Sequence, residues 1–223
     1  MTSLFGLKTG LVLPILCVFC TQPDGVPRSK GQSAVQSRPA PRVAGHLKIL
    51  GFTLGKSTLA DVQAKLGKSS ARRCSPKEEA SKELCYQVDN GHTTLVFEAG
   101  FSGGWKVLDG YKVIAGSSRL SCYRQCPKAS QVTNDVETEG GLKLGLTREE
   151  LLALIGHPEE IRGNKLTFEW QSRQAMTNDQ KEAASKTFDS SITDPYFDVQ
   201  DTIEVTLMDS KVIEFAVNHV VSY

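Results

Sequence analysis

Several patterns that mark enzymes are missing from this sequence of 223 residues. Its four histidines, His46, His92, His157 and His219, are scattered and form no HExxH or similar metal-ligand spacing. The segment GFSGG at residues 100–104 has the GxSxG spacing, but FSGGW is better interpreted as a loop than as the nucleophile elbow of many serine hydrolases. The sequence therefore gives no reason to expect a metal, a cofactor or a serine nucleophile.

The stretch GFTLGKST at residues 51–58 is close to a phosphate-binding loop but is one residue too short. Such a loop needs four residues between its first glycine and its Gly-Lys-Ser/Thr, so that successive backbone N–H groups surround the phosphates. Here Gly51 and Gly55 enclose only three residues. Nucleotide hydrolysis is not expected from this spacing.

Charge of one sign is also lacking, because the formal net charge is only +1, and this gives no indication of nucleic-acid binding. The charge is nevertheless unevenly distributed. Residues 1–45 carry five Lys/Arg and one Asp, residues 46–130 carry thirteen basic and seven acidic residues, and residues 131–223 carry eight and seventeen. Either the two halves attract each other, or each sign faces a different partner.

No apolar run is long enough to span a bilayer, since residues 11–19 fall short of the about 20 residues required. Residues 1–20 instead predict a secretory signal peptide, with Val18 and Cys20 at the −3 and −1 positions of cleavage. Acylation of Cys20 in a lipoprotein is the alternative, although the large Phe19 is unfavourable there. We expect an exported protein, periplasmic or secreted, that contacts the membrane only if a lipid anchors it.

Export changes the meaning of the cysteines that remain after cleavage. There are four of them, Cys74, Cys85, Cys122 and Cys126. An even number in an oxidising compartment predicts two disulfides. Three connectivities are possible, and short loop closure favours the local pairs Cys74–Cys85 and Cys122–Cys126.

The sequence divides into a linker and two similar halves. Residues 21–45 are rich in Pro, Ser and Gln and predict a flexible tether. Residues 46–130 and 131–223 each contain a short helix pattern, at residues 57–67 and 146–156. The matched positions lie 89 residues apart: Thr58 with Thr147, Asp61 with Glu150, Val62 with Leu151, Ala64 with Ala153, Leu66 with Ile155, and Gly67 with Gly156.

Each match has a local physical cause. The threonines are N-caps and the acids three residues on complete capping boxes. The apolar positions form a stripe that one side of a helix can bury, and each glycine ends its helix in a left-handed conformation. Antiparallel strands follow, with turns at Asp89-Asn90-Gly91, Gly163-Asn164 and Asp209-Ser210.

Alternation along the strands of the second half assigns two faces. One face packs under the helices and contains Leu166, Phe168, Trp170, Ile203, Val205, Leu207, Ile213, Phe215 and Val217. The other face is polar and open to water: Thr167, Glu169, Gln171, Thr202, Glu204, Thr206 and Glu214. Two insertions distinguish the halves: residues 69–83, with a short helix capped by Ser75 and Pro76, and residues 172–200, with a helix over about 178–186.

The motif LGxSTxxDVxxxLG at residues 54–67, with the looser copy LGLTREELLALIGHP at residues 144–158, resembles the signature of exported proteins with the beta-lactamase-inhibitor-protein-like fold. This family includes the SmpA type of outer-membrane assembly lipoprotein. Each unit in it is a pair of short helices on an antiparallel sheet, and the inhibitory protein joins two units into one concave sheet. The resemblance implies an α+β fold of two tandem units, with protein binding and no catalytic site.

The sequence departs from the inhibitors of that fold, which use aromatic-rich sheets and an acidic loop residue in the enzyme pocket. Only 7% of its residues are aromatic, and its predicted open face is made of Thr and Glu. No inhibitory residue is therefore carried over. Residues that could contact a partner are Phe101, Trp105, Tyr111, Glu169, Tyr196, Phe197, Glu204 and Glu214. For the aromatic members, packing at the edge of the core is the alternative.

We expect a non-catalytic exported protein-binding module that recognises another envelope or extracellular protein through the open sheet face and its bordering loops. The first alternative is an envelope-assembly or structural protein tethered by a lipid at Cys20. The second is a secreted hydrolase, because Glu169, Glu204 and Glu214 could cluster as paired carboxylates. A solvated strand face explains the same three residues more simply.

Overall fold

The computed structural model describes residues 41–69, 81–88, 92–100, 104–116, 126–178, 181–182 and 195–222. Every described residue belongs to one compact unit, Val35–Tyr223. The predicted signal peptide with Cys20, most of the predicted linker, and Cys74, Phe101 and Cys122 lie outside the described residues. Within the described part, no helix has the length and apolar character needed to cross a membrane.

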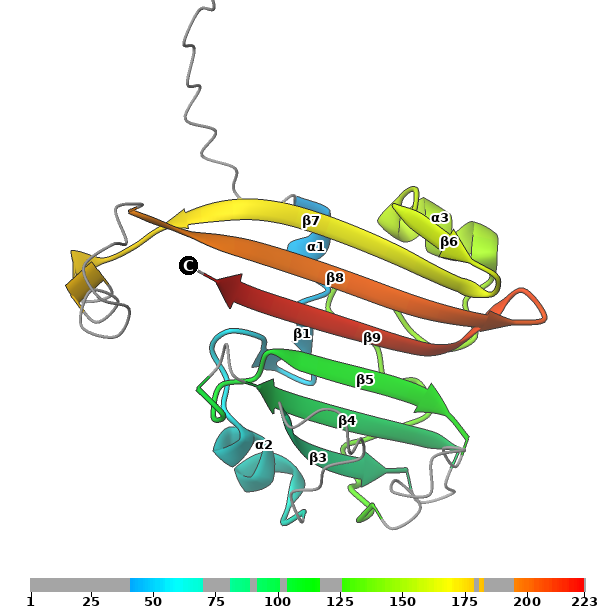
Figure 1. The fold of residues 1–223 in the computed structure, drawn as a ribbon. Coiled ribbons are helices and arrows are strands. Elements are labelled where there is room, and N and C mark those ends of the chain that lie inside the picture. Colours follow the sequence, from blue (N-terminus) through cyan, green and yellow to red (C-terminus); the bar gives the residue numbers. More distant parts are fainter. Residues whose placement is uncertain are drawn as a thin grey trace, which may run out of the picture. The chain divides into compact units, whose positions relative to one another are not determined.

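The main structure is an antiparallel sheet. Its strands are β3 (Ser81–Gln87), β4 (Thr93–Gly100), β5 (Gly110–Ala115), β6 (Glu160–Arg162), β7 (Lys165–Ala175), β8 (Tyr196–Met208) and β9 (Lys211–Ser222). They form one seven-stranded sheet in the order β3-β4-β5-β9-β8-β7-β6 (Figure 1). The last strand of the first half, β5, pairs with the last strand of the second half, β9, so the sheet is continuous. This confirms the predicted α+β fold class.

A small N-terminal region precedes the sheet. It consists of α1 (Pro41–Ala44) and a two-stranded hairpin of β1 (Lys48–Ile49) and β2 (Phe52–Thr53). Val43 in α1 is fully buried. The folded region therefore begins before His46, where the sequence places its start.

The two predicted helices are present as α2 (Leu59–Leu66) and α3 (Arg148–Ile155), and both capping boxes are confirmed. The threonine side chain accepts a hydrogen bond from the third helical N–H, and the acid there accepts one from the threonine backbone: Thr58 with Asp61, and Thr147 with Glu150. These bonds satisfy donors that a helix start otherwise leaves free.

The ends of the helices differ from the expected geometry. Gly67 and Gly156 follow the last helical residues with φ of 95° and 110°. Their ψ values of 174° and −153° are extended, so neither is the left-handed helical residue that the sequence predicts. Glycine is still favoured at both positions, because side chains with a Cβ rarely adopt such φ values.

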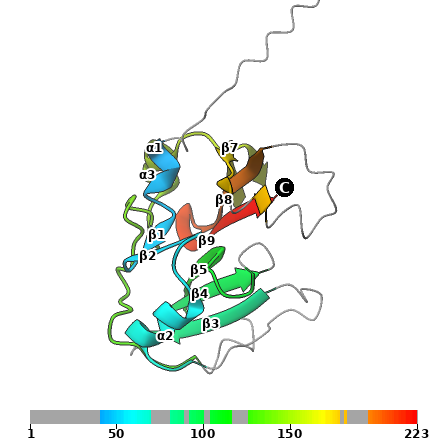
Figure 2. The same cartoon turned by 90° about the vertical axis from the view of Figure 1, so that its left-hand side faces the viewer.

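Both helices pack on the same face of the sheet, as Figure 2 shows for α2 and α3. One core joins them to the two halves of the sheet. The helices contribute Val62, Leu66, Leu151 and Ile155 to it. Figure 2 also places α1 on the helix side.

The alternation in β7 and β8 is confirmed by burial and strand register, but one core assignment in β9 is wrong. Ile213 is only half-buried, whereas Val212 is 1% exposed. The register between β8 and β9 shifts between Thr206 and Leu207, so that Leu207 faces Val212 while Thr206 faces Glu214. This β-bulge inserts one residue and reverses the alternation locally.

The second predicted insertion is shorter than expected. Strand β7 continues to Ala175 and β8 begins at Tyr196, so residues 172–175 and 196–200 belong to the sheet. The residues described between the two strands include Asn178, Lys181 and Glu182, which are helical as predicted. In the first insertion, Ser81–Glu83 already belong to β3, and the predicted cap at Ser75 and Pro76 lies outside the described residues.

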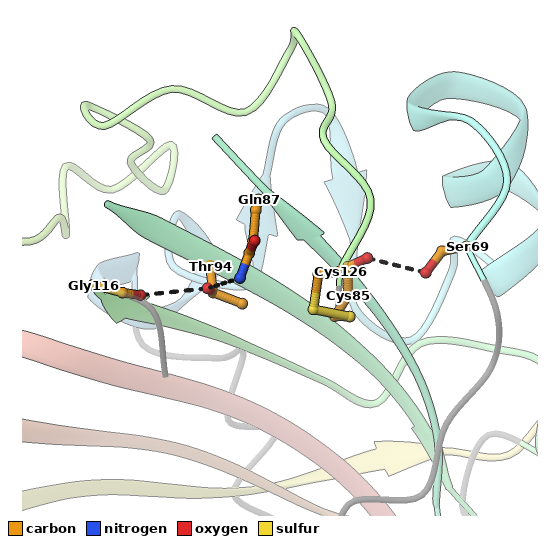
Figure 3. The surroundings of a disulfide bond; sticks show 6 residues. All are labelled: Ser69, Cys85, Gln87, Thr94, Gly116 and Cys126. Atoms are coloured by element: carbon orange, nitrogen blue, oxygen red, sulfur yellow. Dashed lines mark hydrogen bonds between the residues drawn. A yellow bond between two sulfur atoms is a disulfide. The ribbon is translucent and has the colours of Figure 1, made fainter. Parts of the chain in front are cut away.

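The described disulfide joins Cys85 to Cys126, with 5.3 Å between their Cα atoms (Figure 3). The favoured local pairs Cys74–Cys85 and Cys122–Cys126 are therefore wrong. Lys128 forms a parallel bridge with Gln87 of β3, and this places Cys126 beside Cys85. The entropic cost of loop closure increases only slowly with loop length. The alignment of the strands therefore determines which cysteines pair.

The disulfide covers the sheet face that points away from the helices, over β3 to β5. Cys85 and Cys126 form a second, smaller apolar cluster there with Val96 and Ile114. The Ser69 hydroxyl donates a hydrogen bond of 3.0 Å to the Cys85 carbonyl, which ties the end of α2 to β3 (Figure 3). The uncovered polar face lies over β7, β8 and β9.

Candidate functional site

The predicted aromatic contact residues divide into buried and half-exposed ones. Tyr111 is 1% exposed and Phe197 is 5% exposed. The Tyr111 hydroxyl donates a hydrogen bond to the backbone carbonyl of His46, and burial raises the Tyr111 pKa well above its usual value. Both side chains are core residues, so the hypothesis that they contact a partner is wrong.

Trp105 and Tyr196 remain accessible. Trp105 is half-buried in the loop before β5 and has a φ of 62°, a conformation that bulky residues rarely adopt. Tyr196 opens β8, and the Arg173 guanidinium lies 5.1 Å from the centre of its ring. The two aromatic residues belong to opposite halves of the chain and make no contact with each other that would define a single site.

The three predicted glutamates, in contrast, form a line across the uncovered face. Glu169 on β7 lies opposite Thr202 on β8, whereas Glu204 lies opposite Thr167, so the two glutamates are diagonal neighbours. On the other side, Glu204 lies opposite Ala216 and Thr206 lies opposite Glu214. Diagonal neighbours in a sheet are about 7–8 Å apart. We call Glu169, Glu204 and Glu214 the acidic row.

The acidic row forms no salt bridge within the described part of the chain. No described lysine, arginine or histidine forms a salt bridge with any of the three carboxylates. Glu169 accepts a hydrogen bond of 2.8 Å from the Gln171 amide, and both side chains are on the same face. Glu204 is exposed, and Glu169 and Glu214 are half-exposed. The row therefore presents three accessible carboxylates without a salt bridge, although Lys165 is a diagonal neighbour of Glu204 and Lys112 is a diagonal neighbour of Glu214 on the same face.

A separate depression of about 410 Å³ lies at the far end of the same three strands. It is lined by Gln171, Ser172, Arg173, Asp198, Val199, Gln200 and Ser222. Asp198 is the one carboxylate in this lining, and it accepts a hydrogen bond of 3.1 Å from Arg173. The depression does not bring two carboxylates together, as glycoside hydrolysis requires.

One pair of ionisable residues escaped the sequence analysis. Asp201 on β8 is 2% exposed and lies 2.6 Å from Nδ1 of His219 on β9. A signal was present, because Asp201 falls on the buried positions of its strand, between Val199 and Ile203. An acid at such a position needs a partner.

The helix side of His219 is closed by a loop from the other half of the chain. A Cβ on Gly55 would lie 2.8 Å from Nε2 of the His219 ring. The Asp201–His219 pair is thus enclosed and links the two halves. In the described ranges, no group of three or more His, Cys, Asp and Glu side chains has an arrangement that could hold a metal ion.

When the chain was compared with protein-family models, with curated proteins and with solved structures, no match was found in any of the three.

Proposed function

We propose that this chain is a non-catalytic, exported protein-binding module, whose acidic row binds a basic surface of another envelope or extracellular protein. The observation that carries the proposal is the acidic row itself: three accessible carboxylates in a line, on a sheet face that the helices do not cover. A row of like charges attracts an oppositely charged partner and helps to fix its orientation. Strands β7 to β9 give this surface a rigid support.

We further propose that the module consists of two tandem units, residues 46–130 and 131–223. Support comes from corresponding hydrogen bonds in the two halves. In the first, the Gly55 N–H donates to the Leu108 carbonyl and the Leu108 N–H donates to Ser57. In the second, Gly145 donates to Val212, and Val212 donates to Leu146. Each loop before a helix is thus attached to the strand region that closes its half.

The glycines repeat in the same way. Gly55 and Gly145 have φ of 73° and 82°, and Gly51 and Gly141 have φ of 79° and 85°. These values require glycine at equivalent points of both loops. The repeat is consistent with the resemblance to the beta-lactamase-inhibitor-protein-like family, whose members bind proteins. It also identifies the phosphate-loop look-alike as a turn and cap of the fold.

The proposal is tested by capturing and measuring a partner. The exported chain is immobilised and exposed to the envelope and medium fractions of the organism that produces it, and retained proteins are identified by mass spectrometry. A triple variant, Glu169→Gln with Glu204→Gln and Glu214→Gln, is treated in parallel. We expect the partner's dissociation constant to rise about tenfold or more in the variant, and its salt dependence to weaken.

A matched control removes three other acidic charges. Glu137, Glu139 and Glu149 are exposed and lie in the region before α3 or in its first turn. Their triple glutamine variant should bind the partner as the wild type does. Equal loss of binding in both triple variants would show that only total charge matters, and unchanged binding in the acidic-row variant would reject this face as the binding site.

A further inference from the structure

Strand β7 has a long free edge. It contains eleven residues, and only Lys165, Leu166 and Thr167 pair with β6. Among the described strands, none lies beside the outer side of residues 168–175, which we call the free edge. Figure 1 shows β7 as the uppermost strand of the sheet, with β6 beside its right-hand end.

Two hydrogen bonds define which backbone groups point outward along this edge. The Thr167 carbonyl accepts a bond from Glu159, on the β6 side, and the Met176 N–H donates to Pro195, on the β8 side. Because backbone groups alternate between the two sides of a strand, Glu169 and Gln171 direct their N–H and C=O groups outward. The N–H and C=O groups of Arg173 and Ala175 also point outward.

The free edge carries two charged residues, Glu169 and Arg173, but lacks the other usual protections against pairing. Proteins also shorten exposed edges or interrupt them with proline or a bulge. Residues 168–175 contain no proline, and the register between β7 and β8 is unbroken over all eleven pairs. Such an edge is a template for another strand.

The charges along the edge are self-complementary. Glu169, Gln171 and Arg173 are every second residue of β7, so their side chains lie on the open face. The two charged residues are on either side of Gln171. If two β7 strands pair antiparallel about a two-fold axis at Ser172, Gln171 lies opposite Arg173 of the second copy. Glu169 then becomes a diagonal neighbour of that same arginine, within reach of long side chains.

This register also fits the space beside the strand. It pairs residues 169–175 of one chain with residues 175–169 of the other, which uses the free edge and stops before the positions where β6 pairs. On the helix side, the half-buried Trp170 would meet Gln174 of the second copy. Isologous pairing of this kind satisfies both edges at once and forms no open-ended fibre.

We propose that two copies of this chain associate through the free edge of β7, joining their sheets into one. The pairing places two acidic rows on a single face, one on each side of the two-fold axis. Arg173 also holds Asp198 at 3.1 Å, so it bridges its own β8 and the second copy's Glu169. The proposed protein binding does not depend on this association.

The first test uses the edge backbone. Gln171→Pro removes one outward N–H, and proline is tolerated where the N–H of an edge strand faces solvent. The mass in solution is measured by sedimentation equilibrium, with circular dichroism as a check of folding. We expect a dimer for the wild type and a monomer for the variant. The control Glu204→Arg, on the neighbouring strand β8, should remain dimeric while losing the basic partner.

The second test uses the charges and does not require proline to be tolerated. Glu169→Arg and Arg173→Glu each place like charges across the axis, so each variant alone should dimerise about tenfold more weakly. An equimolar mixture of the two should restore the dimer, because every arginine then faces a glutamate. A monomeric wild type, or a dimer that neither Gln171→Pro nor the charge variants weaken, would overturn the proposal.

Discussion

Asp201 and His219 lie 2.6 Å apart, from the carboxylate Oδ1 to the ring Nδ1, and join β8 to β9 on the helix side of the sheet. The Asp201 side chain is 3% exposed and the His219 side chain 16% exposed. Gly55 from the first half approaches the imidazole closely, so this pair lies at a contact between the two halves. It is therefore the polar interaction whose removal should affect the whole described unit.

Asp201→Ala should lower the free energy of unfolding by about 1–3 kcal/mol, because it leaves the enclosed Nδ1 of His219 without its hydrogen-bond partner. Asp201→Asn keeps a hydrogen-bonding group of the same shape and should cost less. Urea unfolding followed by fluorescence measures both. Asp198→Ala, which removes a 66% exposed carboxylate from its pair with Arg173, should cost no more than about 1 kcal/mol. Equal costs for Asp201→Ala and Asp198→Ala would contradict this assignment.

Gly55→Ala should destabilise the chain more than Gly145→Ala. Both glycines have a positive φ, so alanine costs about 1–2 kcal/mol at either position. Only at Gly55 would the new Cβ also collide with the His219 ring, since nothing lies within 4 Å of it at Gly145. In a double-mutant cycle, His219→Ala should reduce the cost of Gly55→Ala towards that of Gly145→Ala. Additive effects would show that the ring moves aside freely.

The features that the sequence predicted well are those with local causes. The capping boxes at Thr58 and Thr147 depend on residues three positions apart, and the turn at Asp209-Ser210 has positive φ at both residues. Alternation in β7 and β8 likewise needs only the strand's own period of two. The line of glutamates could be anticipated as a shared face, but its diagonal order depended on the register between strands.

The features that it missed depend on contacts between distant residues. The Cys85–Cys126 pairing follows from the parallel bridge between Gln87 and Lys128, and no local sequence pattern predicts that bridge. The bulge beside Ile213 arises from pairing with β8. Tyr111 is a core residue because it lies on the face of a central strand that packs against the helices. Fold class was therefore easier to predict than the set of accessible aromatic residues.

Thr58→Ala and Thr147→Ala should each lower the free energy of unfolding by about 1 kcal/mol, because each removes the side chain that caps its helix. Similar costs are expected since the two caps make the same pair of bonds. Thr133→Ala, at an exposed position outside any helix or strand, serves as the control and should change stability by less than about 0.5 kcal/mol. A neutral result at either cap would mean that packing alone holds that helix.

Peptide mapping of the unreduced protein should recover Cys85 linked to Cys126. If both predicted disulfides form, this link leaves Cys74 and Cys122 as the second pair, and thiol titration should then find no free cysteine among the four. Replacing Cys85 and Cys126 together by alanine should cost about 2–4 kcal/mol of stability. A map containing Cys74–Cys85 or Cys122–Cys126 would contradict the structure.

His46 should make stability fall as the solution is acidified from neutral pH. Its side chain is 2% exposed, its Nδ1 lies 3.0 Å from the Thr138 hydroxyl, and burial lowers its pKa below 6.5 in the folded state. The unfolded chain, in which histidine titrates near 6.5, therefore binds a proton before the folded chain does. The contribution of neutral His46 is fully present above pH 6.5 and is lost as the pH falls towards the lowered pKa.

The test is urea unfolding at a series of pH values for the wild type and for His46→Gln. One histidine can contribute a slope of at most about 1.4 kcal/mol per pH unit, and the substitution should remove this part of the slope just below pH 6.5. His157→Gln provides the matched control, because His157 is exposed in the segment after α3. The same slope in wild type and His46→Gln would mean that other groups cause the acid sensitivity, since a residue that does not titrate on unfolding cannot couple stability to pH.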